Sequence, residues 1–263
     1  MATIAENLQA IQDIKQDIKI AIENKGVDLT NTPFSEYSTK IDEITTGGET
    51  FVVPDGMKFS KSTFTTLPDS LDFSNVTDMS YMFHNCSLLT TIPVIDTSNT
   101  TDMYHMFNGC NNLITIPQLN TTNVTTMNYM FSNCKSLTTI PQLNTAKVTI
   151  MYNMFNGCKS LSSLPLFNCG EVNDMGSFFG YSSINTLTHL GGFKDLKISV
   201  TSEFIDLVPN LPIESLMNVI NNLYDLTANG LSGETLVFGQ TNLDKLSAEQ
   251  IAVATAKGWT LTA

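Results

Sequence analysis

Four cysteines recur every 24 residues along the middle of the chain, and regularly spaced thiols are candidate zinc ligands. They are Cys86, Cys110, Cys134 and Cys158. Zinc needs four ligands that converge on one point, whereas one thiol per coil of a repeating fold gives a line. Thiols on coils about 4.8 Å apart also fit poorly with disulfide geometry, because paired Cβ atoms lie about 3.8 Å apart. We therefore expect buried, inert thiols with no metal and no cofactor. Cys169 lies outside the row and is expected to be the more reactive thiol.

Other catalytic patterns are missing from the sequence. His84 and His105 occupy different places in their repeats, so we do not expect them to stack into a pair, and His189 lies further along the chain. Residues 71–190 hold six acidic residues and three lysines, which are scattered. The sequence contains no phosphate-binding glycine loop, nucleophile elbow or zinc-protease motif. We predict no catalytic residue and no enzyme activity.

The charge of the chain disfavours two kinds of anionic partner. The 13 basic residues are all lysines and the net charge is −12, which disfavours binding to nucleic acid or to an anionic membrane surface. The first residues, "MATIAENLQAIQDIKQ", lack the basic start and apolar core of a signal peptide. No apolar run approaches the roughly 18 residues of a membrane span. We expect synthesis in a cytoplasm and no membrane insertion.

The cysteines belong to a longer pattern with the same period. A fixed period of 20 to 29 residues with Leu and Ile anchors is typical of leucine-rich repeats. The recurring residues are Met79, Met103, Met127, Met151 and Met175; Phe83, Phe107, Phe131, Phe155 and Phe179; and Pro93, Pro117, Pro141 and Pro165, with Ser182 in the fifth cysteine place. Asp72, Asp96, Asn120, Asn144 and Asn168 share another place, where their side chains can hold a turn.

Each unit divides into two halves. In "MNYMFSNC" (127–134) the apolar residues are spaced i, i+3, i+4 and i+7, which predicts a short helix with one inward face. In "SLTTIPQLN" (136–144) Leu and Ile alternate with Thr, which predicts a strand that the proline limits. One unit cannot bury its apolar face alone, so stacked units must share a core.

Aromatic residues occupy the two outward places between the methionines of each unit. They are Tyr81, Tyr104, His105, Tyr129 and Tyr152. An aromatic stripe among Asn, Ser and Thr could stack on sugar rings or contact a protein partner. Alternatively, these rings pack on one another between coils. These residues are the candidate binding site.

The Met-x-x-Met-Phe-x-x-Cys pattern resembles the BspA-like leucine-rich-repeat family of bacterial surface proteins over residues 71–190. The resemblance implies a binding or adhesion module rather than an enzyme. Surface members of that family carry an export signal, and the sequence here departs from them in that respect.

Both ends of the chain differ from the repeat. In residues 1–46 an apolar stripe predicts a helix, followed by a shorter helix at 35–44, and such a hairpin is too small to be stable alone. The stripe consists of Ile4, Leu8, Ile11, Ile14, Ile18 and Ile22. Residues 47–70 are expected to be a linker and N-terminal cap, and residues 191–263 a strand–helix cap with a capping box at Ser247 and Gln250. Both terminal segments resemble those of phage-encoded virion and repeat proteins.

The sequence therefore predicts an α/β solenoid: a leucine-rich repeat of five 24-residue units with an N-terminal helical hairpin and a C-terminal strand–helix cap. We expect a phage virion structural protein of a tail, baseplate or appendage that binds a host-surface glycan or protein, or other virion proteins. The N-terminal helices would contact virion proteins, as a homo-oligomer. The alternatives are a secreted or cell-surface bacterial adhesin and a purely architectural capsid or head decoration subunit.

Overall fold

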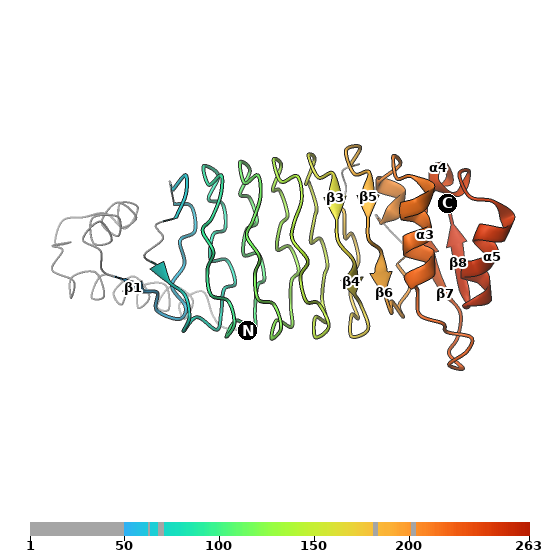
Figure 1. The fold of residues 1–263 in the computed structure, drawn as a ribbon, viewed down its shortest axis with the longest axis horizontal. Helices are drawn as coiled ribbons and strands as arrows, with labels where there is room; N and C mark the ends of the chain where they lie inside the picture. The colour runs from blue at the N-terminus through green and yellow to red at the C-terminus, as the bar shows by residue number, and fades with distance from the viewer. Residues whose placement is uncertain (1–49, 63, 68–70, 181–183, 201–203) are drawn as a thin grey trace, which may run out of the picture.

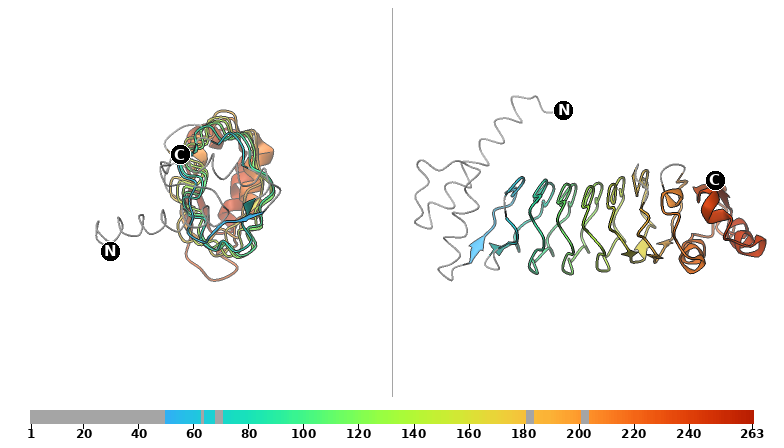
Figure 2. Two further views of the ribbon diagram at one scale, coloured as in Figure 1. Left: turned by 90° about the vertical axis from the view of Figure 1, so that its left-hand side faces the viewer. Right: turned by 90° about the horizontal axis from the view of Figure 1, so that it is seen from above.

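The computed structural model describes residues 50–62, 64–67, 71–180, 184–200 and 204–263. From residue 50 onward, successive coils lie side by side in one row, and helices gather at the C-terminal end of that row (Figure 1). Seen along the row, the coils follow nearly the same outline (Figure 2). We call this row of coils the coil stack.

Backbone hydrogen bonds join each coil to both of its neighbours. The Tyr129 N–H donates to the Tyr152 carbonyl at 2.9 Å, towards the following coil. The Thr149 N–H donates at 2.8 Å to the carbonyl of Thr125, in the preceding coil. These bonds repeat at the period of the sequence, so the repeat places equivalent side chains in rows along the coil stack.

The helix predicted for residues 127–134 is wrong, because this half of the unit is a run of tight turns. Tyr129 and Asn133 have φ angles of 58° and 60°, in the left-handed region that ends a right-handed helix. The Met130 N–H bonds three residues back to the Met127 carbonyl at 3.1 Å. Alternate N–H groups thereby remain free to bond the next coil, which a helix would not allow.

The strands of the coil stack are short and parallel. The pairs are β1 (Phe51–Val52) with β2 (Leu71–Asp72), β3 (Ser163–Leu164) with β5 (His189–Leu190), and β4 (Phe167–Asn168) with β6 (Phe193–Lys194). Pro165 and Leu166 separate β3 from β4. β5 and β6 are instead separated by Gly191 and Gly192, so a proline does not bound every strand. The strand predicted for residues 136–144 does not form, because in that segment only Thr139 makes a parallel bridge, to Ser163.

A column of phenylalanine rings fills the core. Phe83, Phe107, Phe131 and Phe155 have neighbouring ring centroids 5.5–5.7 Å apart and nearly parallel planes. Phe59 extends the column, with its ring 5.8 Å from Phe83. Residues around Phe59 thus stack in register with the coils, within the segment 47–70 for which we predicted a linker and N-terminal cap.

The column changes at the fifth unit. The predicted member, Phe179, follows Phe178, which occupies the place held by methionine in earlier coils. Phe178 meets Phe155 edge-on, with ring centroids 5.2 Å apart. Two adjacent phenylalanines turn the parallel column into an edge-to-face cluster with Phe193 and Phe204.

Helices and two longer strands follow the coils. The elements are η2 (Ile205–Leu207), α3 (Ile213–Asn222), β7 (Glu234–Val237), α4 (Gln240–Leu243), α5 (Ala248–Ala256) and β8 (Trp259–Thr262). β7 and β8 pair in parallel. The Ser247–Gln250 capping box starts α5, as its sequence predicts. Buried Trp259 donates from Nε1 to the Tyr224 carbonyl at 2.8 Å, which ties β8 to the segment after α3.

Candidate binding surfaces

The thiol row lies inside the coil stack and is bonded to the backbone. The Sγ–H of Cys134 donates to the Phe107 carbonyl at 3.1 Å, and Cys158 donates to the Phe131 carbonyl at 3.0 Å. Cys110 and Cys86 make the same bond one and two coils before Cys134. Burial raises the pKa of the Cys158 thiol to about 12. These thiols are held protonated in a line, which is the arrangement expected from their spacing.

Cys169 corrects one expectation. We predicted that it is more reactive than the others, but its side chain is fully buried. Burial raises the pKa of the Cys169 thiol far above its usual range, and the nearby Asp195 carboxylate adds to the effect. A thiol that is protonated and shielded from solvent is a poor nucleophile.

The predicted aromatic residues are brought together by the turns. We define the aromatic ridge as Tyr81, His84, Tyr104, His105, Tyr129 and Tyr152. Tyr81, His105 and Tyr129 occupy the left-handed place of their units, and their rings therefore form one row. Tyr104 and Tyr152 come one residue earlier and flank this row.

The rings of the aromatic ridge pack on one another. The His105 ring is stacked between Tyr81 and Tyr129, at centroid distances of 4.9 and 4.4 Å. His84 also meets His105 edge-on, with centroids 5.9 Å apart, so the two histidines are neighbours although we expected no pairing. Because their faces are covered, the central rings cannot stack on a sugar. The edges of the partly exposed rings remain available for contact.

Both histidines of the aromatic ridge have a pKa below the ordinary value, so His84 and His105 are uncharged at neutral pH. Burial and, to a smaller extent, the neighbouring His84 together lower the pKa of His105 to about 4. Burial also raises the pKa of Tyr81 to about 12, together with its interactions with Tyr104. A row of neutral rings favours an uncharged partner surface.

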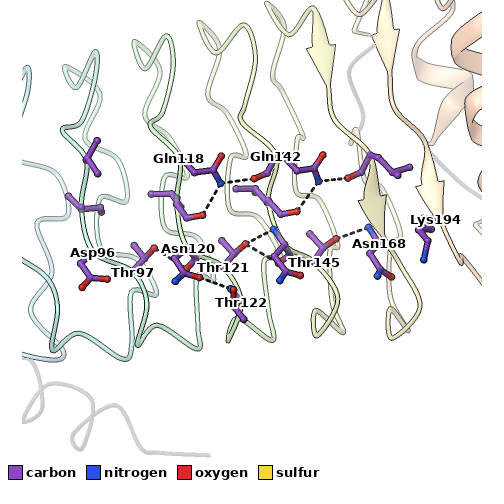
Figure 3. A pocket seen from close by; sticks show the side chains of 16 residues that line it. Asp96, Thr97, Gln118, Asn120, Thr121, Thr122, Gln142, Thr145, Asn168 and Lys194 are labelled. Carbon is purple, nitrogen blue, oxygen red and sulfur yellow. Dashed lines mark hydrogen bonds between the residues drawn. The ribbon is translucent and has the colours of Figure 1, made fainter.

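A second surface was not predicted as a site. A groove of about 810 Å³ runs across several coils, and we call it the polar groove (Figure 3). Its polar lining consists of Asp96, Thr97, Gln118, Asn120, Thr121, Thr122, Gln142, Asn144, Thr145, Asn168 and Lys194, and its apolar lining of Val94, Ile95, Leu119, Leu143 and Leu166. The sequence signal was present in the place shared by Asp96 and Asn120, which we interpreted only as a turn-holding position.

Backbone contacts fix the side chains of the polar groove. Gln118 Nε2 donates to the Gln142 carbonyl at 2.7 Å, and Gln142 Nε2 donates to the Leu166 carbonyl at 2.7 Å (Figure 3). Asn120 Oδ1 accepts from the Thr122 N–H at 3.2 Å. The glutamine bonds join neighbouring coils, and the asparagine bond holds a turn within one coil. Because these bonds recur at the same places of successive units, the lining is a rigid, repeating surface.

In the described ranges, no group of three or more His, Cys, Asp or Glu side chains is arranged to hold a metal ion. Those residues also contain no helix with the length and apolar character needed to cross a bilayer. The predicted anchor residues Ile4, Leu8, Ile11, Ile14, Ile18 and Ile22 lie outside the described residues.

Comparison with known proteins identifies the repeat. The model of the family described as "Mycoplasma protein of unknown function, DUF285" matches residues 55–163 and 77–189, which together span just over half of the chain. The chain belongs to this family. The DUF285 match begins within the coil of Phe59, in agreement with the observed start of the coil stack.

Solved structures give the fold class of this DUF285 protein. A leucine-rich-repeat protein of T. pallidum has a TM-score of 0.50 and 15% identity, covering 77% of this chain and 88% of the other. A leucine-rich-repeat protein of Bacteroides ovatus has a TM-score of 0.33 and 14% identity, covering 81% of this chain and 45% of the other. No curated protein matches the sequence. The fold is of the leucine-rich-repeat type, as predicted.

Proposed function

We propose that this DUF285 protein is a non-enzymatic binding subunit of a phage particle. In this role residues 1–46 anchor it to a tail, baseplate or appendage as a homo-oligomer, and the coil stack binds a host surface or a neighbouring virion protein. The observation that supports binding is the repetition of equivalent outward side chains, one per coil, along a backbone that hydrogen bonds hold rigid. The virion role is supported by the resemblance of both terminal segments to phage proteins.

Multiplicity explains how such a surface would work. Each coil offers a few polar or aromatic contacts, and each contact alone is weak. Several coils on one chain and several chains on one particle raise the effective concentration of sites, so avidity can exceed the single-site affinity by a factor of about 10² to 10⁴. A subunit of this kind needs regular spacing more than it needs a deep pocket.

A bacterial adhesin is the second candidate. The description of the matched family names Mycoplasma proteins, and this supports a bacterial protein. A decoration subunit that recognises nothing outside the particle is a third possibility, because the aromatic ridge could equally contact other virion chains.

Immunogold labelling with an antibody against the full chain separates these functions. We expect label at the tail or baseplate of purified particles, and binding of the purified full chain to host cells. Label on the bacterial envelope would identify an adhesin instead. Label on the particle without cell binding would identify a decoration subunit.

The aromatic ridge is tested in the same cell-binding assay. Replacement of Tyr104, Tyr129 and Tyr152 by Ala removes three rings while leaving the polar groove intact. Reduced cell binding by this folded variant would assign the aromatic ridge to recognition, and unchanged binding would leave it a structural feature of the coil stack.

A further inference from the structure

Two rows of side chains run along the polar groove with one member of each row per coil. We call Val94, Gln118, Gln142 and Leu166 the glutamine row, and Asp96, Asn120, Asn144 and Asn168 the asparagine row. Figure 3 shows the labelled members of both rows side by side along the coils. A ligand that lies along the axis of the coil stack would meet the same pair of side chains at each coil.

The amides of both rows keep one unused side. Both N–H groups of Gln118 and Gln142 donate to backbone carbonyls. Asn144 Oδ1 accepts from the Ala146 N–H at 3.1 Å, and Asn168 Oδ1 accepts from the Gly170 N–H at 3.1 Å. Among the described residues, no hydrogen bond engages Oε1 of the glutamines or Nδ2 of Asn120, Asn144 and Asn168. The polar groove thus presents a row of acceptors beside a row of donors.

Charge occurs only at the ends of the polar groove. Asp96 lies at one end, and Lys194, which is paired with Asp195 at 2.6 Å, lies at the other. The members between them are neutral amides and hydroxyls. A polymer with a charge on each unit would find no counter-charge along this length, and a polyanion would also be repelled by the net charge of −12. The matching ligand is therefore uncharged.

The spacing of the coils distinguishes between two classes of uncharged polymer, polypeptides and polysaccharides. Coils joined by parallel backbone bonds lie about 4.8 Å apart. An extended polypeptide returns a side chain to the same face every two residues, or about 6.7 Å, so it loses register with the coils. A pyranose ring linked through opposite positions advances a chain by a distance close to one coil, and each of its hydroxyls both donates and accepts.

We propose that the polar groove binds a linear, uncharged polysaccharide along the coil axis, with one sugar unit per coil. The Gln Oε1 atoms accept from sugar hydroxyls, and the Asn Nδ2 groups donate to them. Val94 and Leu166 provide apolar contact for the C–H groups of the rings at the two ends of the glutamine row. This inference rests on the proposed function, in which the coil stack binds a surface polymer.

The repeat itself supplies conservative variants. Asp96 shows that Asp holds the same turn, because its Oδ1 accepts the Ser98 N–H at 2.8 Å. Asn120→Asp with Asn144→Asp therefore replaces two donors by charged acceptors while keeping both turns. Leu166 shows that Leu fits the glutamine row, so Gln118→Leu with Gln142→Leu removes the acceptors. Asn112→Ala is the matched control, since Asn112 is exposed and does not line the polar groove.

The test measures binding of the full chain to linear neutral oligosaccharides of glucose, mannose, galactose and N-acetylglucosamine by isothermal titration calorimetry. Each series runs from disaccharide to hexasaccharide. We expect affinity for at least one series to rise up to the tetra- or pentasaccharide and then level off, because four to five coils line the polar groove. Each double variant should weaken that binding about tenfold or more, and Asn112→Ala should not change it.

Three results would overturn the inference: no binding in any series, binding that both folded double variants leave unchanged, or equal binding of a uronic-acid hexasaccharide. Failure here is distinguishable from failure of the proposed function. Cell binding that persists in the groove variants overturns only the polysaccharide site. Groove-dependent sugar binding by a protein found on a bacterial envelope overturns only the virion role.

Discussion

The Cys134 thiol donates a hydrogen bond to the backbone carbonyl of Phe107, one coil earlier, across 3.1 Å. The two residues are 27 positions apart, and the same bond recurs at each of the four regularly spaced cysteines. A serine in this place would bring a more strongly hydrated hydroxyl into an apolar core, whereas a thiol is a small apolar group with a weak donor. The recurring cysteine is thus explained by packing rather than by reactivity.

The first prediction concerns these thiols. None of the five cysteines should react with Ellman's reagent in the native protein near pH 8, because all five are buried and burial raises the pKa of each one. After unfolding in guanidinium chloride, all five should react. An Asn112→Cys variant, with its thiol at an exposed position, should show one reactive group in the native state. A native reaction at Cys169 would contradict the structure and restore the prediction made from sequence.

Spacing alone predicted the repeat, its apolar core and the leucine-rich-repeat fold class. It did not predict the local backbone, because i, i+3, i+4 and i+7 spacing also arises when residues of left-handed φ break the helix at regular places. Tyr129 and Asn133 are such residues. Asn tolerates the left-handed region, and the same place holds Gly109 and Gly157 in neighbouring coils. The alternation of Asn with Gly was the signal for turns, and the helix prediction overlooked it.

The second prediction uses this alternation. A Cβ on Gly157 would lie 2.8 Å from Oδ1 of Asn133, whose side chain occupies the space above it. Gly157→Ala should therefore lower the free energy of unfolding by two contributions. A residue with a Cβ costs about 1–2 kcal/mol at a left-handed φ, and the clash with Asn133 adds to this. Gly56→Ala is the control for the first part, because Gly56 has φ of 83° and open space around it. Chemical denaturation of both variants measures the difference.

Adding Asn133→Gly to Gly157→Ala should relieve the clash, because the Asn133 side chain is removed. The free-energy cost of placing alanine at a left-handed φ should remain. The double variant should therefore resemble Gly56→Ala in its loss of unfolding free energy. Equal losses for Gly157→Ala and Gly56→Ala, with no recovery in the double variant, would show that the Asn133 side chain moves aside without cost.

The polar groove could not be derived from the sequence in the same way. Asn and Gln at fixed places indicate turns or ladders, and both features are present, as Asn120 and Gln118 show. That these side chains leave one polar edge unused depends on which amide atom faces the backbone, and only coordinates give that. The aromatic residues were found by spacing, but the covering of the His105 ring by Tyr81 and Tyr129 depends on the left-handed turns.

The third prediction concerns how much ring stacking in the phenylalanine column contributes to the free energy of unfolding. Phe131 stacks on two parallel rings, at 5.7 and 5.5 Å, and aromatic pairs are worth about 0.5–1.5 kcal/mol beyond their buried area. Phe131→Leu should therefore cost about 1–3 kcal/mol more than Phe238→Leu. Phe238 is equally buried and, within the described part of the chain, makes no ring contact. Equal losses in urea unfolding would mean that the column contributes through burial alone.

The fourth prediction concerns acid stability. The pKa of His105 is about 4 in the folded protein, against an ordinary value of 6.5, because burial and the neighbouring His84 disfavour the charged ring. Between these values the unfolded chain binds a proton that the folded chain does not bind, so folding stability falls as pH drops from 6.5 to about 4. His105→Tyr should remove this contribution and keep the packing, since Tyr81 and Tyr129 occupy the same place in their coils.

Thermal unfolding across that range tests the prediction. The melting temperature of His105→Tyr relative to the native protein should rise as pH falls below 6.5, and the difference should be constant above neutral pH, where His105 is neutral in both states. Asn112→Ala is the control, because Asn112 is exposed and its side chain carries no titratable group, so its replacement should leave the pH dependence unchanged. A pH-independent difference for His105→Tyr would show that His105 takes up its proton within the aromatic ridge as readily as in the unfolded chain.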